Sequence, residues 1–353
     1  MSKLFEPLRM GAFVLRNRIV MAPLTRARAG DARIPNALMA EYYAQRASAG
    51  MILSEATSVT PMGVGYAATP GLWSDEQVSG WRLVTNAVHR EGGLILAQLW
   101  HVGRISDPIF LNGKRPVAPS AIAAEGHVSL LRPERPYVTP RALAVEEIAE
   151  IVTAYRIAAE NAERAGFDGV ELHGANGYLL DQFLQDSTNR RTDGYGGPIE
   201  NRARLLLEAT DAAISVWGAE RVGVHLAPRG DAHSMGDSNP LGTFTYVARE
   251  LGARKIAFIA ARERQADDWI GPHIKAAFGG VYIVNEGFDC ESAEFVIAAG
   301  QADAVAFGKL YIANPDLVVR FAQDLPLNQP RPNTFYHGDS EGYTDYPAAR
   351  KAA

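Results

Sequence analysis

The sequence has only one cysteine, Cys290, among 353 residues. A lone cysteine excludes an internal disulfide and any zinc or iron–sulfur site built on a cysteine cluster, and it fits a reducing compartment. No long basic run is present and the net charge is −5, so we expect no nucleic-acid partner. The chain also lacks a signal-peptide pattern and an apolar stretch long enough to span a bilayer. These absences predict a cytoplasmic protein that does not bind membranes.

Short apolar runs instead alternate with amphipathic segments along the whole chain. The runs are rich in Val, Ile, Leu and Ala, as parallel strands buried on both faces should be. Strands are predicted at residues 19–22, 51–55, 94–99, 169–172, 222–226, 255–259, 281–284 and 304–307. Helical spacing of apolar residues predicts helices at 36–49, 76–91, 147–165, 199–217, 293–300 and 315–323.

Eight strands, each followed by a helix or loop, predict an α/β fold in which residues 1–353 form one (β/α)8 TIM barrel. A doubly wound sheet is the alternative, but no Gly-x-Gly-x-x-Gly joins an early strand to a helix. Residues 5–15 are expected to form a hairpin that caps the barrel bottom. Residues 106–140 form a long insertion after the third strand, and 228–243 are expected to form a second long loop. Both would lie at the C-terminal rim, where barrel active sites lie.

Three polar side chains directly follow the apolar run at 169–172, namely His173, Asn176 and Tyr178. At the end of a buried strand, this spacing lets all three face one pocket. His and Asn can polarise a substrate carbonyl, and Tyr can give a proton to a nearby carbon. The alternative is a loop in which Asn and Gly only make a turn and Tyr packs on the core.

The other predicted strand ends carry amides, a hydroxyl and aromatic rings. They lack the carboxylate pair of a glycosidase and the His/Asp/Glu spacing of a divalent metal site, so no metal is expected. Thr25 and Gln98 suit the edge of a flat heteroaromatic ring, whereas Gly287 and the pair Gly308-Lys309 suit a phosphate. Flavin mononucleotide (FMN) is a ligand that needs both ends.

At this point the motifs resemble those of the old yellow enzyme family, and in particular its bacterial branch of N-ethylmaleimide, morphinone and pentaerythritol tetranitrate reductases. The motifs run in order across nearly the whole chain. They are Asn17-Arg-Ile-Val-Met-Ala-Pro-Leu-Thr-Arg, Gly65-Tyr-x3-Pro-Gly, Gln98-Leu-Trp-His-x-Gly-Arg, His173-Gly-Ala-Asn-Gly-Tyr-Leu-Leu, Arg191-Thr-Asp-x-Tyr-Gly-Gly, Glu200-Asn-Arg, Ala306-Phe-Gly, Ile312-Ala-Asn-Pro-Asp and Glu341-Gly-Tyr-Thr-Asp-Tyr-Pro.

The resemblance implies an FMN-dependent ene-reductase that uses NADPH or NADH to reduce the C=C bond of α,β-unsaturated carbonyl or nitro compounds. Hydride would come from the flavin and the proton from Tyr178, while His173 and Asn176 bind the activating oxygen. The implied cofactor contacts are Pro23, Leu24, Thr25, Ala56, Gln98, His225, Asn285, Glu286, Gly287, Gly308 and Lys309. The implied substrate contacts are Tyr66, Trp100 and Tyr343. The only expected partner is a small activated alkene, and the protein is expected to be a monomer or homodimer.

Three residues depart from the family pattern on the flavin side. His225 replaces an arginine that faces the flavin pyrimidine, Lys309 replaces an arginine at the phosphate, and Glu286 replaces a small residue or glycine. A neighbouring arginine such as Arg262 could compensate, as could Arg229 or Arg264. Alternatively, the barrel binds FMN weakly or not at all. It would then use Tyr178, His173 and Asn176 for ligand binding or for non-redox acid–base chemistry, such as isomerisation or conjugate addition.

Overall fold

The computed structural model describes residues 2–349, and its centre is a closed barrel of eight parallel strands. Each strand pairs with the next along the chain, and the last pairs with the first. This arrangement confirms the (β/α)8 prediction. In order around the barrel the strands are β3 (Ile19–Met21), β4 (Met51–Leu53), β6 (Ile95–Trp100), β9 (Gly169–Gly174), β10 (Val222–Leu226), β11 (Phe258–Arg262), β12 (Val281–Asn285) and β13 (Ala304–Phe307).

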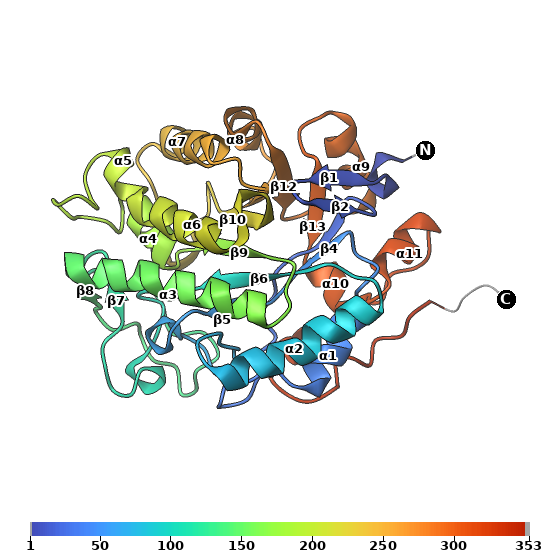
Figure 1. The fold of residues 1–353 in the computed structure, drawn as a ribbon, viewed down its shortest axis with the longest axis horizontal. Coiled ribbons are helices and arrows are strands. Elements are labelled where there is room, and N and C mark those ends of the chain that lie inside the picture. Colours follow the sequence, from blue (N-terminus) through green and yellow to red (C-terminus); the bar gives the residue numbers. More distant parts are fainter. Residues whose placement is uncertain (1, 350–353) are drawn as a thin grey trace.

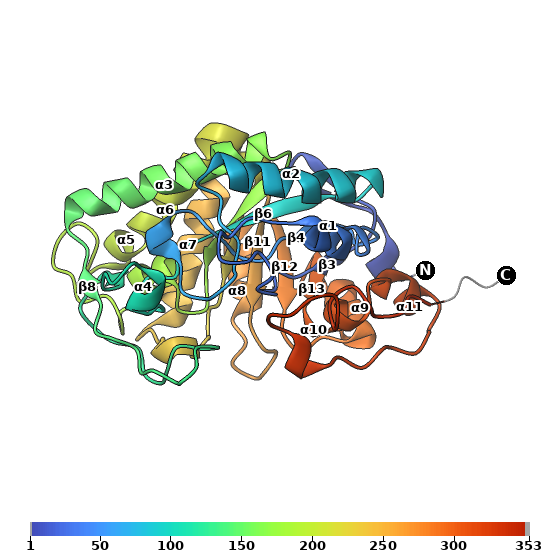
Figure 2. The ribbon, with the colours of Figure 1, turned by 90° about the horizontal axis from the view of Figure 1, so that it is seen from below.

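Helices surround the strands in both ribbon views (Figures 1 and 2). They are α1 (Ala37–Ala44), α2 (Asp75–Arg90), α3 (Val145–Arg164), α4 (Leu179–Leu184), α5 (Ile199–Arg202), α6 (Arg204–Trp217), α7 (Pro240–Ala253), α8 (Gly271–Phe278), α9 (Cys290–Ala298), α10 (Lys309–Ala313) and α11 (Leu317–Ala322). Within residues 2–349, no helix has the length and apolar character that crossing a membrane requires.

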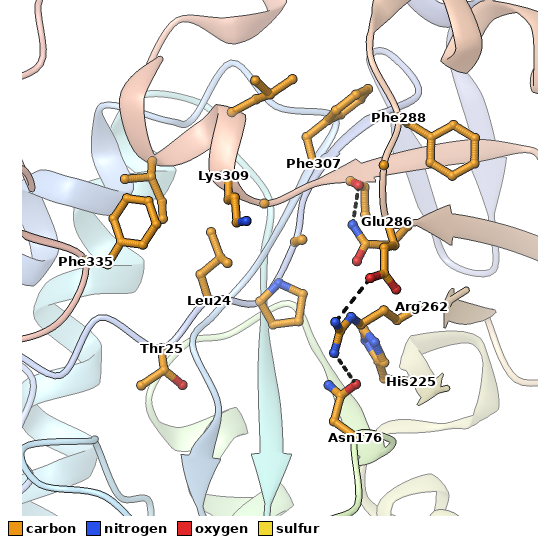
Figure 3. Close-up of a pocket in the computed structure, with 18 of the residues that line it drawn as sticks. Leu24, Thr25, Asn176, His225, Arg262, Glu286, Phe288, Phe307, Lys309 and Phe335 are labelled. Carbon is orange, nitrogen blue, oxygen red and sulfur yellow. Dashed lines mark hydrogen bonds and ion pairs between the residues drawn. The ribbon is translucent and has the colours of Figure 1, made fainter. Parts of the chain in front are cut away.

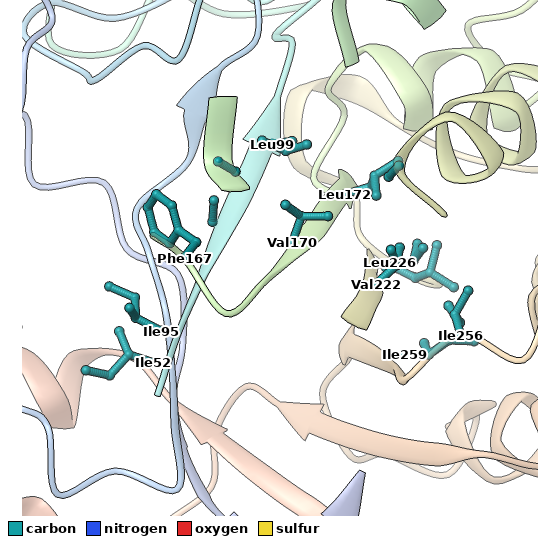
Figure 4. Close-up of a cluster of buried hydrophobic side chains, with 14 of the residues drawn as sticks. Ile52, Ile95, Leu99, Phe167, Val170, Leu172, Val222, Leu226, Ile256 and Ile259 are labelled. Atoms are coloured by element: carbon teal, nitrogen blue, oxygen red, sulfur yellow. The ribbon is translucent and has the colours of Figure 1, made fainter. Parts of the chain in front are cut away.

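Side-chain alternation along the strands places the larger apolar core between the barrel and its helices. Inside the barrel, polar residues lie near the carboxyl ends of the strands. On β9, Val170 and Leu172 belong to the large cluster between strands and helices, part of which Figure 4 shows. Their neighbours on the strand, Glu171 and His173, are also buried but point to the other face of the sheet. The period of two therefore sends polar side chains toward the barrel axis at its carboxyl end.

An N-terminal hairpin closes the opposite end of the barrel, as predicted. Strands β1 (Leu8–Met10) and β2 (Phe13–Leu15) pair antiparallel, and their apolar side chains join the inner barrel cluster. The backbone N–H of Ala12 donates to the carbonyl of Glu220, just before β10. Figure 1 shows this hairpin at one end of the molecule, with β7 (Val117–Ala118) and β8 (Arg141–Ala142), which flank the long insertion, at the other.

Several boundaries differ from the predictions, among them the start of β11 and the start of α7. Strand β11 begins three residues later than expected, because Lys255 (φ 58°) donates its N–H to the carbonyl of Gly252 in a turn after α7. The loop predicted over 228–243 is wrong at its end, where α7 begins at Pro240. The Asn239 side chain accepts from the Gly242 N–H at 3.0 Å, so Asn-Pro is an N-cap followed by a first helical residue.

Candidate active site

A cavity of about 680 Å³ opens at the carboxyl ends of the barrel strands. Figure 3 shows side chains from several strand ends pointing into it. It brings together residues that lie far apart in the sequence. Among the predicted site residues, those that line it are Pro23, Leu24, Thr25, His173, Asn176, His225, Asn285, Glu286, Gly287, Gly308 and Lys309.

The loop after β9 is held rigidly. Asn176 (φ 56°) and Gly177 (φ 76°) both adopt the left-handed conformation. A side chain at Gly177 would lie 2.9 Å from the carbonyl oxygen of Ala232, so only glycine fits there. The Gly177 N–H donates to Asp181 at 2.9 Å, and His233 donates to the Asn176 carbonyl at 2.7 Å. These contacts fix where Asn176 points.

Tyr178 lies in an aromatic wall beside the cavity. Its hydroxyl is 3.0 Å from the hydroxyl of Tyr66, and its ring meets Trp100 edge-on with centroids 4.9 Å apart. The Tyr178 and His173 rings also meet edge-on, with centroids 5.0 Å apart. Tyr178, Tyr66 and Trp100 pack together beside the cavity and are not among its lining residues, whereas His173 lines it. The structure thus brings all four predicted residues together.

Burial sets the protonation states of this group. It lowers the pKa of His173 well below its usual value, and the nearby His225 and Arg262 lower it further. The ring of His173 is therefore neutral near pH 7 and offers one donor and one acceptor. Burial likewise raises the pKa of the Tyr178 phenol, which keeps its proton.

Beneath the cavity, three polar side chains meet inside the barrel. Gln98 donates to one oxygen of Glu171 at 2.7 Å, and the other oxygen is 3.6 Å from Nδ1 of His225. Within the described residues, neither ring nitrogen of His225 has a hydrogen-bond partner, and neither does Nδ1 of His173. Buried polar groups are normally paired. A ligand with a polar edge would satisfy these atoms.

The far side of the cavity is cationic. Lys309 follows β13 and faces the cavity across from Asn176 (Figure 3). In residues 2–349 no acidic side chain forms an ion pair with it. Gly308 packs against Leu24, and a methyl group added there would lie 3.3 Å from Leu24 Cδ2. A cation beside this close-packed glycine suits the anionic end of a ligand.

The other three predicted residues do not line the cavity. Tyr343 is fully buried and stacks on Tyr42 with centroids 4.1 Å apart, so the structure does not place it as a substrate contact. Instead, two other aromatic residues of the tail, Phe335 and Tyr336, reach the cavity. Ala56 packs in the aromatic cluster behind the cavity. Gln98 is buried inside the barrel, beneath the cavity.

Both Glu286 and Arg262 were named from the sequence, but the ion pair between them was not expected. The Arg262 guanidinium donates to Asn176 Oδ1 at 3.0 Å and to Glu286 at 3.3 Å (Figure 3). The sequence names Arg262 only as one of three possible compensating arginines. The strand prediction stops at residue 259, three residues before β11 ends at Arg262, and the sequence does not show which side chains the guanidinium binds.

Comparisons with known proteins agree over almost the full length. The profile of the NADH:flavin oxidoreductase / NADH oxidase family matches residues 3–328. A probable flavin mononucleotide-dependent alkene reductase of Leishmania infantum is 44% identical and is matched over 98% of this chain and 97% of its own length.

Solved structures of similar proteins have the same fold. An old yellow enzyme homologue from Zymomonas mobilis superposes with a TM-score of 0.95 at 45% identity, covering 98% of this chain and 99% of its own. Morphinone reductase in complex with tetrahydroNAD superposes with a TM-score of 0.96 at 46% identity, covering 99% of this chain and 98% of its own.

Proposed function

Because the chain belongs to the NADH:flavin oxidoreductase / NADH oxidase family, we propose that Tyr178, His173 and Asn176 form the substrate-binding and proton-donating part of its active site. The protein is an NAD(P)H-dependent flavin oxidoreductase with FMN as cofactor, and it reduces the C=C bond of activated alkenes. No finding favours the flavin-free alternative.

The donors around the cavity fit FMN. The unpaired ring nitrogens of His225, next to Gln98 and Glu171, suit the polar edge of the flavin pyrimidine. Lys309, beside Gly308, suits the phosphate. Thr25 would donate to the flavin O4, and Pro23 and Leu24 would line the ring. Asn285 and Gly287 would face the phosphate end, as would Glu286, whose carboxylate Arg262 neutralises. Ala56 would lie behind the ring.

When bound, FMN supplies hydride to the alkene and is restored by NAD(P)H. The protein supplies the rest of the chemistry. His173 and Asn176 donate to the carbonyl or nitro oxygen, and they stabilise the negative charge that develops there in the transition state. Tyr178 gives its proton to the α-carbon, while Tyr66 and Trp100 shape the substrate side. The observation that carries the proposal is the convergence of these three polar side chains at the end of β9.

Tyr178→Phe tests the proton donor. We expect alkene reduction to slow by about 100-fold or more, the size of a general-acid contribution. NADPH-driven reduction of the flavin should stay near wild type, because no proton from Tyr178 enters that step. Stopped-flow absorbance at the flavin band measures both half-reactions separately. Equal loss of both would make Tyr178 a structural residue.

Tyr66→Phe is the matched control. It removes the same 3.0 Å hydrogen bond but leaves the Tyr178 hydroxyl in place. We expect a much smaller loss of alkene reduction. If both variants lose as much, the hydrogen bond rather than the Tyr178 proton matters.

The strands whose ends surround this cavity, from β3 to β13, close into one barrel. We therefore propose that residues 1–353 act as one domain and that each subunit of a monomer or homodimer carries a complete site. Light scattering of the FMN-loaded protein, together with FMN stoichiometry, tests this: one FMN per chain is expected in either state, and one FMN per dimer would contradict it.

A further inference from the structure

Arg262 is a charged cavity residue to which the reaction described above gives no role. Its guanidinium links Oδ1 of Asn176 at 3.0 Å to a carboxylate oxygen of Glu286 at 3.3 Å. Figure 3 shows it lying between these two side chains. The bridge therefore joins the loop after β9, the end of β11 and the residue that follows β12. One of the residues it holds is the proposed substrate-oxygen donor.

The chemistry of the bridge fixes the direction of the Asn176 amide. A guanidinium can only donate hydrogen bonds, so it must hold the amide oxygen and not the amide nitrogen. The Nδ2 donor is then left for a ligand, and no acceptor in residues 2–349 is bonded to it. Rotation of the amide by half a turn would bring its N–H groups against the cation, which is unfavourable.

The backbone of Glu286, which anchors the bridge, is strained. Its φ is 93°, a conformation that glycine adopts freely and that other residues rarely adopt. Strain of this kind persists at sites where the surrounding structure requires it. The carboxylate that it brings to the cavity is paired with Arg262. The strained residue is thus the anchor of the arginine.

We propose that Arg262, anchored by Glu286, is a positioning residue that keeps the Asn176 amide nitrogen directed at the substrate oxygen. This proposal rests on the assignment of Asn176 as a donor to that oxygen. Arg262 acts through Asn176 and does not itself bind the substrate. The side chain thereby tunes how strongly the site holds a carbonyl or nitro group.

Arg262→Ala in the FMN-loaded enzyme is the direct test. We expect kcat/KM for 2-cyclohexenone to fall about tenfold or more, and the Kd for cyclohexanone, which has the carbonyl but no alkene, to rise by a similar factor. The assays are run at saturating FMN, because the variant leaves the Glu286 carboxylate without its partner near the phosphate end. Under these conditions NADPH-driven flavin reduction should not change. Glu286→Gln should shift both quantities in the same direction by less. Unchanged cyclohexanone binding in both variants would overturn the proposal.

Arg264→Ala is the matched control for charge. Arg264 lines the same cavity two residues further on, and its side chain forms no hydrogen bond or ion pair with any described residue. Its removal takes a cation from the rim without touching Asn176, so at saturating FMN the Kd for cyclohexanone should stay near the wild-type value, whatever happens to FMN affinity. An equal loss in this variant would mean that the general positive charge matters, which would overturn the positioning role.

The decisive experiment repeats Arg262→Ala in an Asn176→Ala background. If Arg262 acts only through Asn176, its removal there should cost little more. A further tenfold loss would mean that Arg262 acts directly on the ligand, and the proposal would be wrong. Wild-type enzyme that binds cyclohexanone but reduces no alkene would refute the proposed reaction instead, and the binding cycle would still decide the role of Arg262.

Discussion

The buried polar residues of this barrel are of two kinds, those that can bind a ligand and those that stabilise the fold. His173 and His225 keep ring nitrogens without partners next to a cavity. Glu55 is equally buried, but its carboxylate accepts from the backbone N–H groups of Arg26 and Ala27 and from the Tyr43 hydroxyl. The two histidines can therefore donate to or accept from a ligand, whereas Glu55 stabilises the fold.

Glu55 should make the stability depend on pH. Burial raises its pKa from 4.5 to about 7. Between these values the folded chain holds a proton that the unfolded chain releases, so its contribution to stability falls as the pH rises. In Glu55→Gln this loss disappears. Relative to wild type, the free energy of unfolding should therefore rise by up to about 3 kcal/mol from pH 5 to pH 8.

Urea unfolding at both pH values measures this difference. Asp181 also has its pKa raised to about 7 by burial, so the variant should keep part of the wild-type slope. A constant difference between Glu55→Gln and wild type across the range would show that Glu55 is ionised in the folded protein throughout.

At the scale of elements, the segment from Thr334 to Gly342 is held by arginines from the start of the chain. Arg28 donates to the carbonyls of Thr334, Asp339 and Glu341, and Arg26 donates to those of Phe335 and Gly342. These contacts place Phe335 and its neighbour on the cavity. The tail thus completes the site although it belongs to no strand or α-helix of the barrel.

Arg28→Ala should loosen this segment. Several charge-assisted hydrogen bonds are lost, and we expect the free energy of unfolding to drop by about 2–4 kcal/mol. Amide exchange should accelerate in residues 334–342, as measured by mass spectrometry. Arg28→Lys should behave similarly, because an ammonium cannot hold so many carbonyls. Arg9→Ala, at an exposed position on the hairpin, is the control and should change neither the unfolding free energy nor the exchange of residues 334–342. Unchanged exchange in Arg28→Ala would mean that packing alone holds the tail.

These hydrogen bonds from Arg26 and Arg28 to the tail also show why some of the site could not be predicted. Arginines that bind backbone carbonyls do not depend on which side chains the partner residues carry, so the sequence holds no signal for the hydrogen bonds between Arg28 and the tail. Strands buried on both faces do leave such a signal, and all eight were located. For β11 the apolar run begins before the turn at Lys255 is complete, and the register was therefore misplaced. The bridge made by Arg262 could not be predicted, because it depends on how side chains from separate parts of the chain meet in space.

At the scale of the whole molecule, stability and chemistry lie at opposite ends of the barrel. The hairpin fills the amino-terminal end with Met10, Phe13 and Leu15, whereas the cavity occupies the carboxyl end. The family resemblance and the strand ends predicted this polarity, because side chains that follow parallel strands gather at one rim.

Phe13→Ala should therefore weaken the fold and spare the reaction. Phe13 is buried in the inner cluster, and its removal should cost about 3–5 kcal/mol in unfolding free energy. The KM for 2-cyclohexenone should stay near wild type at temperatures where the variant is folded. Val14→Ala, on the exposed face of the same hairpin, should change neither thermal stability nor KM. A raised KM in Phe13→Ala would show that the two ends are coupled.

The hydrogen bonds from Arg26 and Arg28 to the tail have a consequence for the order of events during synthesis. The ribosome delivers Arg26 and Arg28 early, but the carbonyls that they bind, in residues 334–342, are made about 300 residues later. Strand β3 likewise waits for β13 before the barrel can close. A nascent chain thus has no finished pocket until residues 334–342 have been made and have folded back, and cofactor loading belongs to the period after that step.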